Sequence, residues 1–280
     1  MKIVKTITEL RLELNELRKN GEQMGLVPTM GALHEGHISL MNKARLISPN
    51  IVASIFVNPT QFGPNEDFSN YPRTLESDLE KCRQAGLALV FCPVTSEVYE
   101  NDTFISFKLN TLGEHLCGSK RPGHFNGVIQ IVNKLFNLFK PDFAVFGQKD
   151  IQQFRIIEQM NKEFNHDVDL VRGETMRAAD GLALSSRNRY LNTDERKLAP
   201  ALYHTLKSIQ SEIMNNTPID TALQKYTSEL DKSGLKTDYL SVVSYRELQP
   251  ITAILKGEPF IIAGAVYLGK TRLIDNIVVE

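Results

Sequence analysis

Short apolar runs alternate with amphipathic stretches through the first two thirds of the chain. The apolar runs are typical of strands buried on both faces, and they cover residues 24–28, 51–57, 88–92, 143–146 and 168–171. The amphipathic stretches have helical spacing, from about residue 36 and over residues 75–85, 128–139 and 151–164. Strands separated by helices predict an open parallel sheet with right-handed crossovers, and therefore a Rossmann-like α/β domain.

The remaining segments of this part are less regular. At the N-terminus, a short strand leads into a helix in which Thr6 and Glu9 have capping-box spacing and which Gly21 ends. The alternating segment Phe104–Leu109 predicts a further strand. Residues 117–127 are rich in glycine and are expected to be irregular. Three prolines exclude a helix from the long polar loop between residues 58 and 74.

The pattern changes after about Thr193. Two predicted helices, over residues 194–214 and 219–233, are followed by apolar strand-like runs at residues 239–244, 260–266 and 274–279. Because strands and helices no longer alternate, we expect a smaller α+β domain here. The predicted division is a Rossmann-like domain over residues 1–180 and a smaller α+β C-terminal domain over residues 181–280.

The most informative stretch is GLVPTMGALHEGHISL, residues 25–40. It leads from a predicted strand through Gly31 and Gly36 into a helix, a junction that presents backbone N–H groups to a phosphate. His34 and His37 are three residues apart and can face the same way. Metal binding is the rival interpretation, but H-E-G-H lacks the spacing of H-E-x-x-H. The sequence therefore favours a nucleotide-phosphate site and predicts no metal ligands.

Amino-acid composition limits the classes of partner and the cellular compartment that fit this protein. The chain of 280 residues is 42% hydrophobic and 23% charged, and its formal net charge of −1 gives no basic footprint for nucleic acid. The 3 cysteines form neither a metal nor a disulfide pattern, which favours a reducing, cytoplasmic setting. The sequence contains no apolar run of about 20 residues, so no membrane span is expected.

Further donors follow later predicted strands. Gly147–Asp150 forms a second strand–glycine–helix junction and carries Lys149, and Leu184–Arg187 offers two hydroxyls and a guanidinium. His124 could be functional or simply packed against Phe125. The sequence shows no carboxylate pair for hydrolysis and no serine or cysteine triad signature. A site rich in donors and poor in nucleophiles suits phosphoryl or nucleotidyl transfer.

Several ordered motifs, from P-T-M-G-A-L-H-E-G-H through N-P-T-Q-F-G-P-N-E-D-F, R-P-G-H-F-N-G-V, F-G-Q-K-D and L-S-S-R-N-R-Y-L to T-R-L-I-D-N, resemble the pantothenate synthetase (pantoate–β-alanine ligase) family. That family belongs to the H-x-G-H nucleotidylyltransferases, and the resemblance runs from about Gly25 to Asn276. It implies an ATP-dependent, AMP-forming condensation of (R)-pantoate with β-alanine through pantoyl adenylate, with release of diphosphate.

The resemblance also implies roles for individual residues. The implied catalytic residues are His34, His37, Lys149, Ser185, Ser186 and Arg187. The implied ATP-binding residues are Met30, Gly31, Ala32, Leu33, His34, Glu35, Gly36, His37, Gly147, Gln148, Lys149, Asp150, Met176, Leu184, Ser185, Ser186 and Arg187. Gln61 and Gln153 match positions that hold pantoate, and Mg²⁺ is expected to arrive on the ATP phosphates. The loop from Gly63 to about Arg73 resembles a mobile cover, and the family implies a homodimer.

The chain departs from the family pattern at a few positions. Cys117 and Ala178 stand where many relatives carry glutamate, and Met176 replaces a more usual valine. Two rival functions remain. One is another H-x-G-H enzyme that acts on a phosphorylated acceptor, which would need basic residues where this chain has glutamines. The other is a nucleotide-binding protein without catalysis, against which the complete H-E-G-H, K-D and S-S-R sets argue.

Overall fold

In the computed structural model, which describes residues 1–19, 21–64, 66–99 and 104–280, the predicted strands pair into a six-stranded parallel sheet. The strand order is β1-β4-β3-β2-β5-β6, and each neighbouring pair is parallel. The strands are β1 Lys2–Val4, β2 Met24–Thr29, β3 Asn50–Ile55, β4 Leu89–Phe91, β5 Phe143–Gly147 and β6 Asp169–Gly173. The predicted α/β fold class is confirmed.

The chain divides into two compact units. The first comprises residues 1–108, 122–147 and 156–174, and the second comprises residues 109–121, 148–155 and 175–280. The predicted division into two domains at residue 180 stays a prediction.

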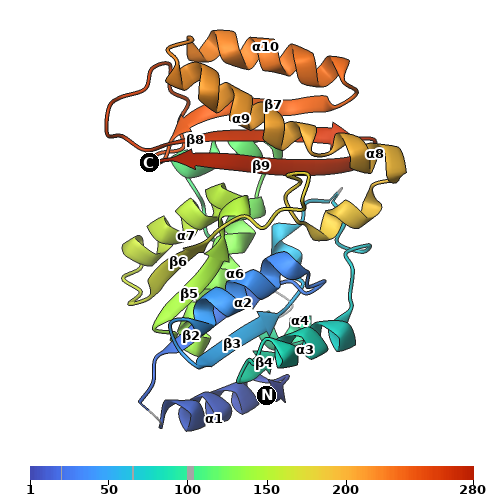
Figure 1. Cartoon of the computed structure of the whole chain (residues 1–280). Coiled ribbons are helices and arrows are strands. Elements are labelled where there is room, and N and C mark those ends of the chain that lie inside the picture. The colour runs from blue at the N-terminus through green and yellow to red at the C-terminus, as the bar shows by residue number, and fades with distance from the viewer. Residues whose placement is uncertain (20, 65, 100–103) are drawn as a thin grey trace. The chain divides into compact units, whose positions relative to one another are not determined.

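Helices cover both faces of the sheet in the first unit. The α-helices that lie wholly in it are α1 Ile7–Arg18, α2 Glu35–Arg45, α3 Leu75–Gln84, α4 Thr95–Val98 and α6 His124–Phe139. Helix α2 lies across the central strands, as Figure 1 shows, and shares one buried apolar cluster with α3. Helices α1 and α6 contact each other, and right-handed crossovers place them on the opposite face. The result is a doubly wound sheet.

The winding direction reverses next to β2. From β2 the chain proceeds outward to β3 and β4, whereas β5 returns to pair with β2 on its other side. The carboxyl ends of β2 and β5 therefore lie side by side at Thr29 and Gly147. Open α/β sheets bind ligands at such a switch point, because the following connections leave in opposite directions.

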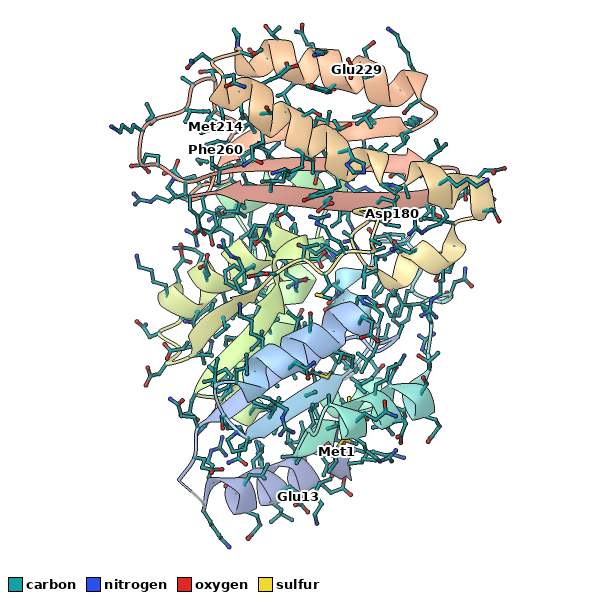
Figure 2. All side chains as sticks on the ribbon, viewed as in Figure 1. Met1, Glu13, Asp180, Met214, Glu229 and Phe260 are labelled. Carbon is teal, nitrogen blue, oxygen red and sulfur yellow. The ribbon has the colours of Figure 1, made fainter. Side chains whose placement is uncertain are left out.

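The second unit is built on a three-stranded antiparallel sheet, in the order β7-β8-β9. Its strands and longer helices are β7 Lys236–Ser244, β8 Phe260–Leu268, β9 Thr271–Val279, α8 Thr193–Leu198, α9 Ala201–Met214 and α10 Ile219–Lys232. Helices α9 and α10 pack on the sheet around a shared apolar cluster. In Figure 2, Glu229 marks α10 and Phe260 marks the start of β8. This unit confirms the predicted smaller α+β part of the fold.

Short elements complete the described chain. They are η1 Pro59–Gln61, η2 Thr111–Gly113, α5 Leu116–Lys120, η3 Gln148–Asp150 and η4 Ser186–Tyr190. Helix α7, Ile151–Glu163, begins in the second unit and continues in the first. Within the described residues, no helix combines the length and apolar character that crossing a membrane requires.

Sequence predictions were wrong in detail at several places. Residues 104–109 form no strand, and Phe104 is 88% exposed, while Phe107 packs against Phe164 instead of pairing with a strand edge. The predicted helix over residues 194–214 is two helices, α8 and α9. It is interrupted at Pro200, because proline has no backbone N–H and its ring clashes with the preceding turn.

The region from residue 117 to residue 127 is more regular than predicted. Helix α5 ends at Lys120, and α6 already begins at His124. Gly127 lies inside α6, where an added Cβ would overlap the backbone carbonyl of Thr60. The glycine therefore permits close packing against η1 and does not interrupt the helix.

The three cysteines are free and buried. Burial raises the pKa of the Cys82 thiol to about 12 and that of the Cys92 thiol to about 11. Almost no thiolate is present at these two positions near pH 8, and the thiolate is the reactive form.

We therefore expect Cys82 and Cys92 in the native protein to react with a chromogenic disulfide reagent far more slowly than in the denatured chain. The measurement is the time course of thiol release at pH 8 with and without denaturant. A rapid native phase that peptide mapping assigns to Cys82 or Cys92 would contradict this expectation.

Candidate active site

The turn after β2 has an unusual backbone. Gly31 has a φ of 79° and Ala32 a φ of 50°, so two consecutive residues are left-handed. For alanine this conformation costs roughly 1 kcal/mol. The side chain of Thr29 accepts from the N–H of Gly31 at 3.2 Å and donates to the Ser54 carbonyl at 2.8 Å. Specific hydrogen bonds therefore hold the turn at the end of β2.

His34 and His37 cap helix α2 reciprocally. His34 is the N-cap residue, and its Nδ1 accepts from the N–H of Gly36 at 3.1 Å. The Nδ1 of His37 accepts from the N–H of His34 at 3.3 Å, and the two ring centroids are 4.2 Å apart. A backbone N–H can only donate, so both Nδ1 atoms are unprotonated and each neutral ring carries its proton on Nε2. The two histidines, predicted to act together, do lie together.

Gln61 lies in a buried polar network of the first unit. Its Oε1 accepts from Asn58 Nδ2 at 3.0 Å, and its Nε2 is 3.0 Å from the Met30 sulfur. Tyr99 donates its hydroxyl to Asn58 Oδ1 at 2.8 Å. Burial raises the pKa of Tyr99 to about 12, so the phenol stays protonated as this donor. The network fixes which end of the Gln61 amide faces which partner, and it brings the predicted pantoate and ATP residues Gln61 and Met30 together.

His124 is a packed residue. It is buried at the start of α6, its Nδ1 lies 2.7 Å from the backbone oxygen of Gln61, and its ring packs against Phe125. Since the carbonyl can only accept, Nδ1 carries the proton here. This contact supports the backbone of Gln61, as the packed alternative of the sequence analysis expects.

The sequence did not single out Asn58, Tyr99 or Asp78, although all three are buried in polar contacts around these residues. Asn58 stands shortly after a buried apolar strand, which was a usable signal. Asp78 gave no signal, because an acidic residue in the first turn of a helix is ordinary.

The Gly147–Asp150 segment follows β5. Gly147 ends that strand, and the next three residues form η3 in the second unit. Asn276 donates its Nδ2 to the carbonyls of Gln148 and Lys149, each at 2.9 Å. The Lys149 ammonium lies 3.8 Å from the Asp150 carboxylate. Asn276, from the T-R-L-I-D-N motif, therefore secures the backbone that carries Lys149.

The T-R-L-I-D-N motif also contacts the chain next to Met176, another predicted ATP-binding residue of the second unit. Asp275 pairs with Arg177, whose Nη2 donates to Oδ1 at 2.9 Å and whose guanidinium lies over the Tyr203 ring at 3.7 Å. Arg177 follows Met176, and the Met176 carbonyl accepts from the N–H of Leu184 at 2.9 Å. Residues 176 and 184, predicted to serve ATP together, are thus adjacent.

The Ser185–Arg187 turn is held locally. Ser185 caps η4, and its Oγ accepts from the N–H of Arg187 at 3.3 Å. Ser186 and Arg187 are half-buried. Gln153, in the first turn of α7, is also half-buried, whereas its neighbour Gln152 is buried and holds the carbonyls of Leu112 and His115. Gln152 is therefore structural, and the predicted role of Gln153 stays a prediction.

The structure shows the contacts of Cys117 and Ala178, two of the residues that depart from the family pattern. The Cys117 sulfur lies 3.3 Å from the Tyr239 hydroxyl and 3.5 Å from Nη1 of Arg272, which pairs with Asp238 at 2.8 Å. Ala178 packs at the edge of the apolar cluster of the second unit. Both positions belong to the second unit, whereas the H-x-G-H turn belongs to the first.

The predicted site residues are divided between the units. Met30–His37, Gln61 and Gly147 belong to the first unit, and the other predicted site residues belong to the second. Among the described residues, no three histidine, cysteine, aspartate or glutamate side chains gather in a way that could hold a metal ion.

Comparisons with known proteins identify the family. A family model described as pantoate-beta-alanine ligase matches residues 2–278. A pantothenate synthetase from Stutzerimonas stutzeri is 46% identical over 285 residues, which cover 100% of this chain and 98% of the relative. One from Coprothermobacter proteolyticus is 44% identical over 287 residues, which cover 100% of this chain and 99% of that protein.

Solved structures agree with this match. The crystal structure of pantothenate synthetase from Thermus thermophilus has a TM-score of 0.91 and 39% identity, and the match covers 99% of both chains. Pantoate-beta-alanine ligase from Francisella tularensis, complexed with beta-gamma ATP and beta-alanine, has a TM-score of 0.84 and 33% identity, over 99% of this chain and 97% of that one. The chain belongs to the pantoate-beta-alanine ligase family.

Proposed function

We propose that this protein is an AMP-forming ligase that condenses (R)-pantoate with β-alanine. In the first step the pantoate carboxylate attacks the α-phosphorus of ATP, which forms pantoyl adenylate and releases diphosphate. In the second step the β-alanine amine attacks the acyl carbon, which forms pantothenate and releases AMP. The observation that carries this proposal is the family match over residues 2–278.

The histidine pair supports the first step. Since both Nδ1 atoms accept backbone N–H groups, each ring presents an Nε2–H donor at the N-terminus of α2. A helix N-terminus with added donors favours the negative charge that develops on the α-phosphate. We therefore assign His34 and His37 to charge stabilisation by hydrogen bonding, with His37 donating from Nε2.

The second unit supplies the remaining donors in this proposal. Lys149, Ser185, Ser186 and Arg187 are assigned to the phosphate oxygens of ATP, because ammonium, hydroxyl and guanidinium groups suit them. Met176 and Leu184, whose backbones are joined at 2.9 Å, are assigned to the adenine. Mg²⁺ is assigned to the ATP phosphates themselves, since this ion binds substrate phosphates with few protein ligands.

Gln61 and Gln153 are assigned to pantoate. An amide can donate to one substrate oxygen and accept from a hydroxyl. The Gln61 amide is oriented by neutral groups, Asn58 and Met30. Neutral surroundings suit a hydroxy acid better than a phosphorylated acceptor, which counts against the rival H-x-G-H transferase.

The loop over residues 63–73 is assigned to cover the site. Position 65 lies outside the described residues. Phe62 packs against Phe68 and Tyr71, with ring centroids 5.3 and 5.8 Å apart, and Arg73 lies over the Phe68 ring. A loop that carries its own aromatic cluster can move as one piece, and its closure would protect the acyl adenylate from water.

We also propose, from the family resemblance, that the protein acts as a homodimer in the cytoplasm. The free, buried cysteines support a reducing compartment.

The first test follows the two steps separately. With ATP and pantoate but no β-alanine, diphosphate should appear once per active site and then stop, because the adenylate stays bound. Added β-alanine should start continuous release of both diphosphate and AMP. The measurement is a quenched time course with labelled ATP. Steady diphosphate release that does not depend on pantoate would rule the proposal out.

The second test addresses His37. Since its Nε2–H acts mainly in the transition state, His37→Ala should lower kcat by roughly 100-fold or more, the range seen when one preorganised donor is removed. The KM for ATP should change far less. The matched control is His204→Ala, an exposed histidine in the second unit, which should leave both constants unchanged. A large rise in KM at normal kcat would instead make His37 a ground-state contact.

A further inference from the structure

We propose that Asp78 and Lys81 of helix α3 are positioning residues for the H-x-G-H turn. This inference rests on the proposed function, because it assigns to these residues the task of holding His34 and His37 for the adenylation step. Asp78 is 1% exposed. Its Oδ2 accepts from the N–H of Ala32 at 2.9 Å, and its Oδ1 accepts from the N–H of Leu33 at 2.8 Å.

The turn requires such an acceptor because its N–H groups are buried. Ala32 and Leu33 are 0% and 2% exposed, so water cannot replace the carboxylate. Ala32 is also in the left-handed region with a φ of 50°. A charged acceptor forms stronger hydrogen bonds than a neutral one, and a single carboxylate can accept both N–H groups. Asp78 therefore holds the turn in a backbone conformation that alanine disfavours.

Lys81 completes the contact one turn further along α3. Its Nζ donates to the carbonyl of Leu33 at 2.6 Å. Residues three apart on a helix face the same side, so one face of α3 binds both the N–H and the carbonyl of Leu33. His34, the N-cap of α2, follows directly. The orientation of the first histidine is thus set by a helix that contributes no predicted site residue.

The glycine of the turn is part of the same contact. A Cβ at Gly31 would lie 3.1 Å from Asp78 Oδ2 and 3.2 Å from a methyl group of Ile55. The turn therefore approaches the Asp78 carboxylate so closely that a side chain at position 31 would displace the carboxylate.

Asp78 also connects the turn to the end of the long loop. Thr74 Oγ1 donates to Asp78 Oδ2 at 3.1 Å, and Thr74 follows directly after the proposed covering loop. The same carboxylate thus anchors the last residue before α3 and the turn that leads to the histidines.

The experiment compares Asp78→Asn and Lys81→Met with Glu80→Gln. The control is a carboxyl-to-amide change on the same helix, at an exposed residue that pairs with Arg83. Asparagine has the shape of aspartate but turns an N–H₂ group toward one of the two buried donors. Because small misplacements of catalytic groups can cost about 100-fold in rate, we expect kcat for pantoate-dependent diphosphate release to fall roughly 100-fold in Asp78→Asn. The KM values should stay within about threefold.

A second readout needs no substrate. Nitrogen-15 spectra of the imidazole rings should show His34 and His37 as Nε2–H tautomers in the wild type and in Glu80→Gln. These signals should shift or exchange with other forms in Asp78→Asn and Lys81→Met. If Asp78→Asn does not fold, Lys81→Met decides the matter, because a lysine-to-methionine change at a half-buried position removes only the Leu33 contact.

The inference would be overturned if a folded Asp78→Asn had wild-type kcat and unchanged imidazole signals. If Asp78→Asn does not fold, the same result in Lys81→Met would overturn it. A purely structural role predicts a lower Tm with unchanged kcat and unchanged tautomers, and that result would also overturn it. Failure of the proposed function looks different: the wild type itself would release no pantoate-dependent diphosphate, while the ring signals would still report on positioning.

Discussion

The winding direction of the parallel sheet reverses between β2 and β5, and this reversal sets where the two strand–glycine–helix junctions begin. Because the sheet is parallel, every strand ends at the same edge, and only at the reversal do the following connections separate. Both strand–glycine–helix junctions of the sequence leave from these two neighbouring strands, at Thr29 and Gly147. Backbone pairing alone thus brings the starts of the two junctions, Thr29 and Gly147, next to each other at the edge of the sheet of the first unit.

The β2 junction combines backbone strain with tight hydrogen bonding. A turn with two left-handed residues would relax into other conformations if its N–H groups had only water as partners. Burial of the turn removes the water, and Asp78, Thr29 and Lys81 supply the hydrogen bonds. The two histidines then cap α2 with their Nδ1 atoms, so that each ring carries its proton on Nε2. Such rigidity is what electrostatic preorganisation requires, because donors must be oriented before charge develops.

In the second unit, too, buried polar side chains hold the backbone of predicted site segments by hydrogen bonds. Asn276 and Asp275, consecutive on β9, hold the carbonyls of residues 148 and 149 and the guanidinium of Arg177. The T-R-L-I-D-N motif therefore acts through the backbone of other segments. The motif stands far along the chain from the residues it supports, which is why sequence spacing alone gives no hint of its task.

Sequence patterns were sufficient to predict the alternation of strands and helices, the change of pattern near residue 193 and the residue types of the candidate site. These are local properties, because the spacing of apolar residues, the positions of glycines and the types of donor group can be read from neighbouring residues. The folded structure was needed to show that Phe104–Leu109 forms no strand, that His124 supports Gln61, and that Gly127 belongs inside a helix. It alone revealed the contacts of Asp78 and the tautomers of His34 and His37. The physical reason is the same in each case: a hydrogen-bond partner or a close backbone approach arises from residues far apart in the chain, and no local pattern encodes it.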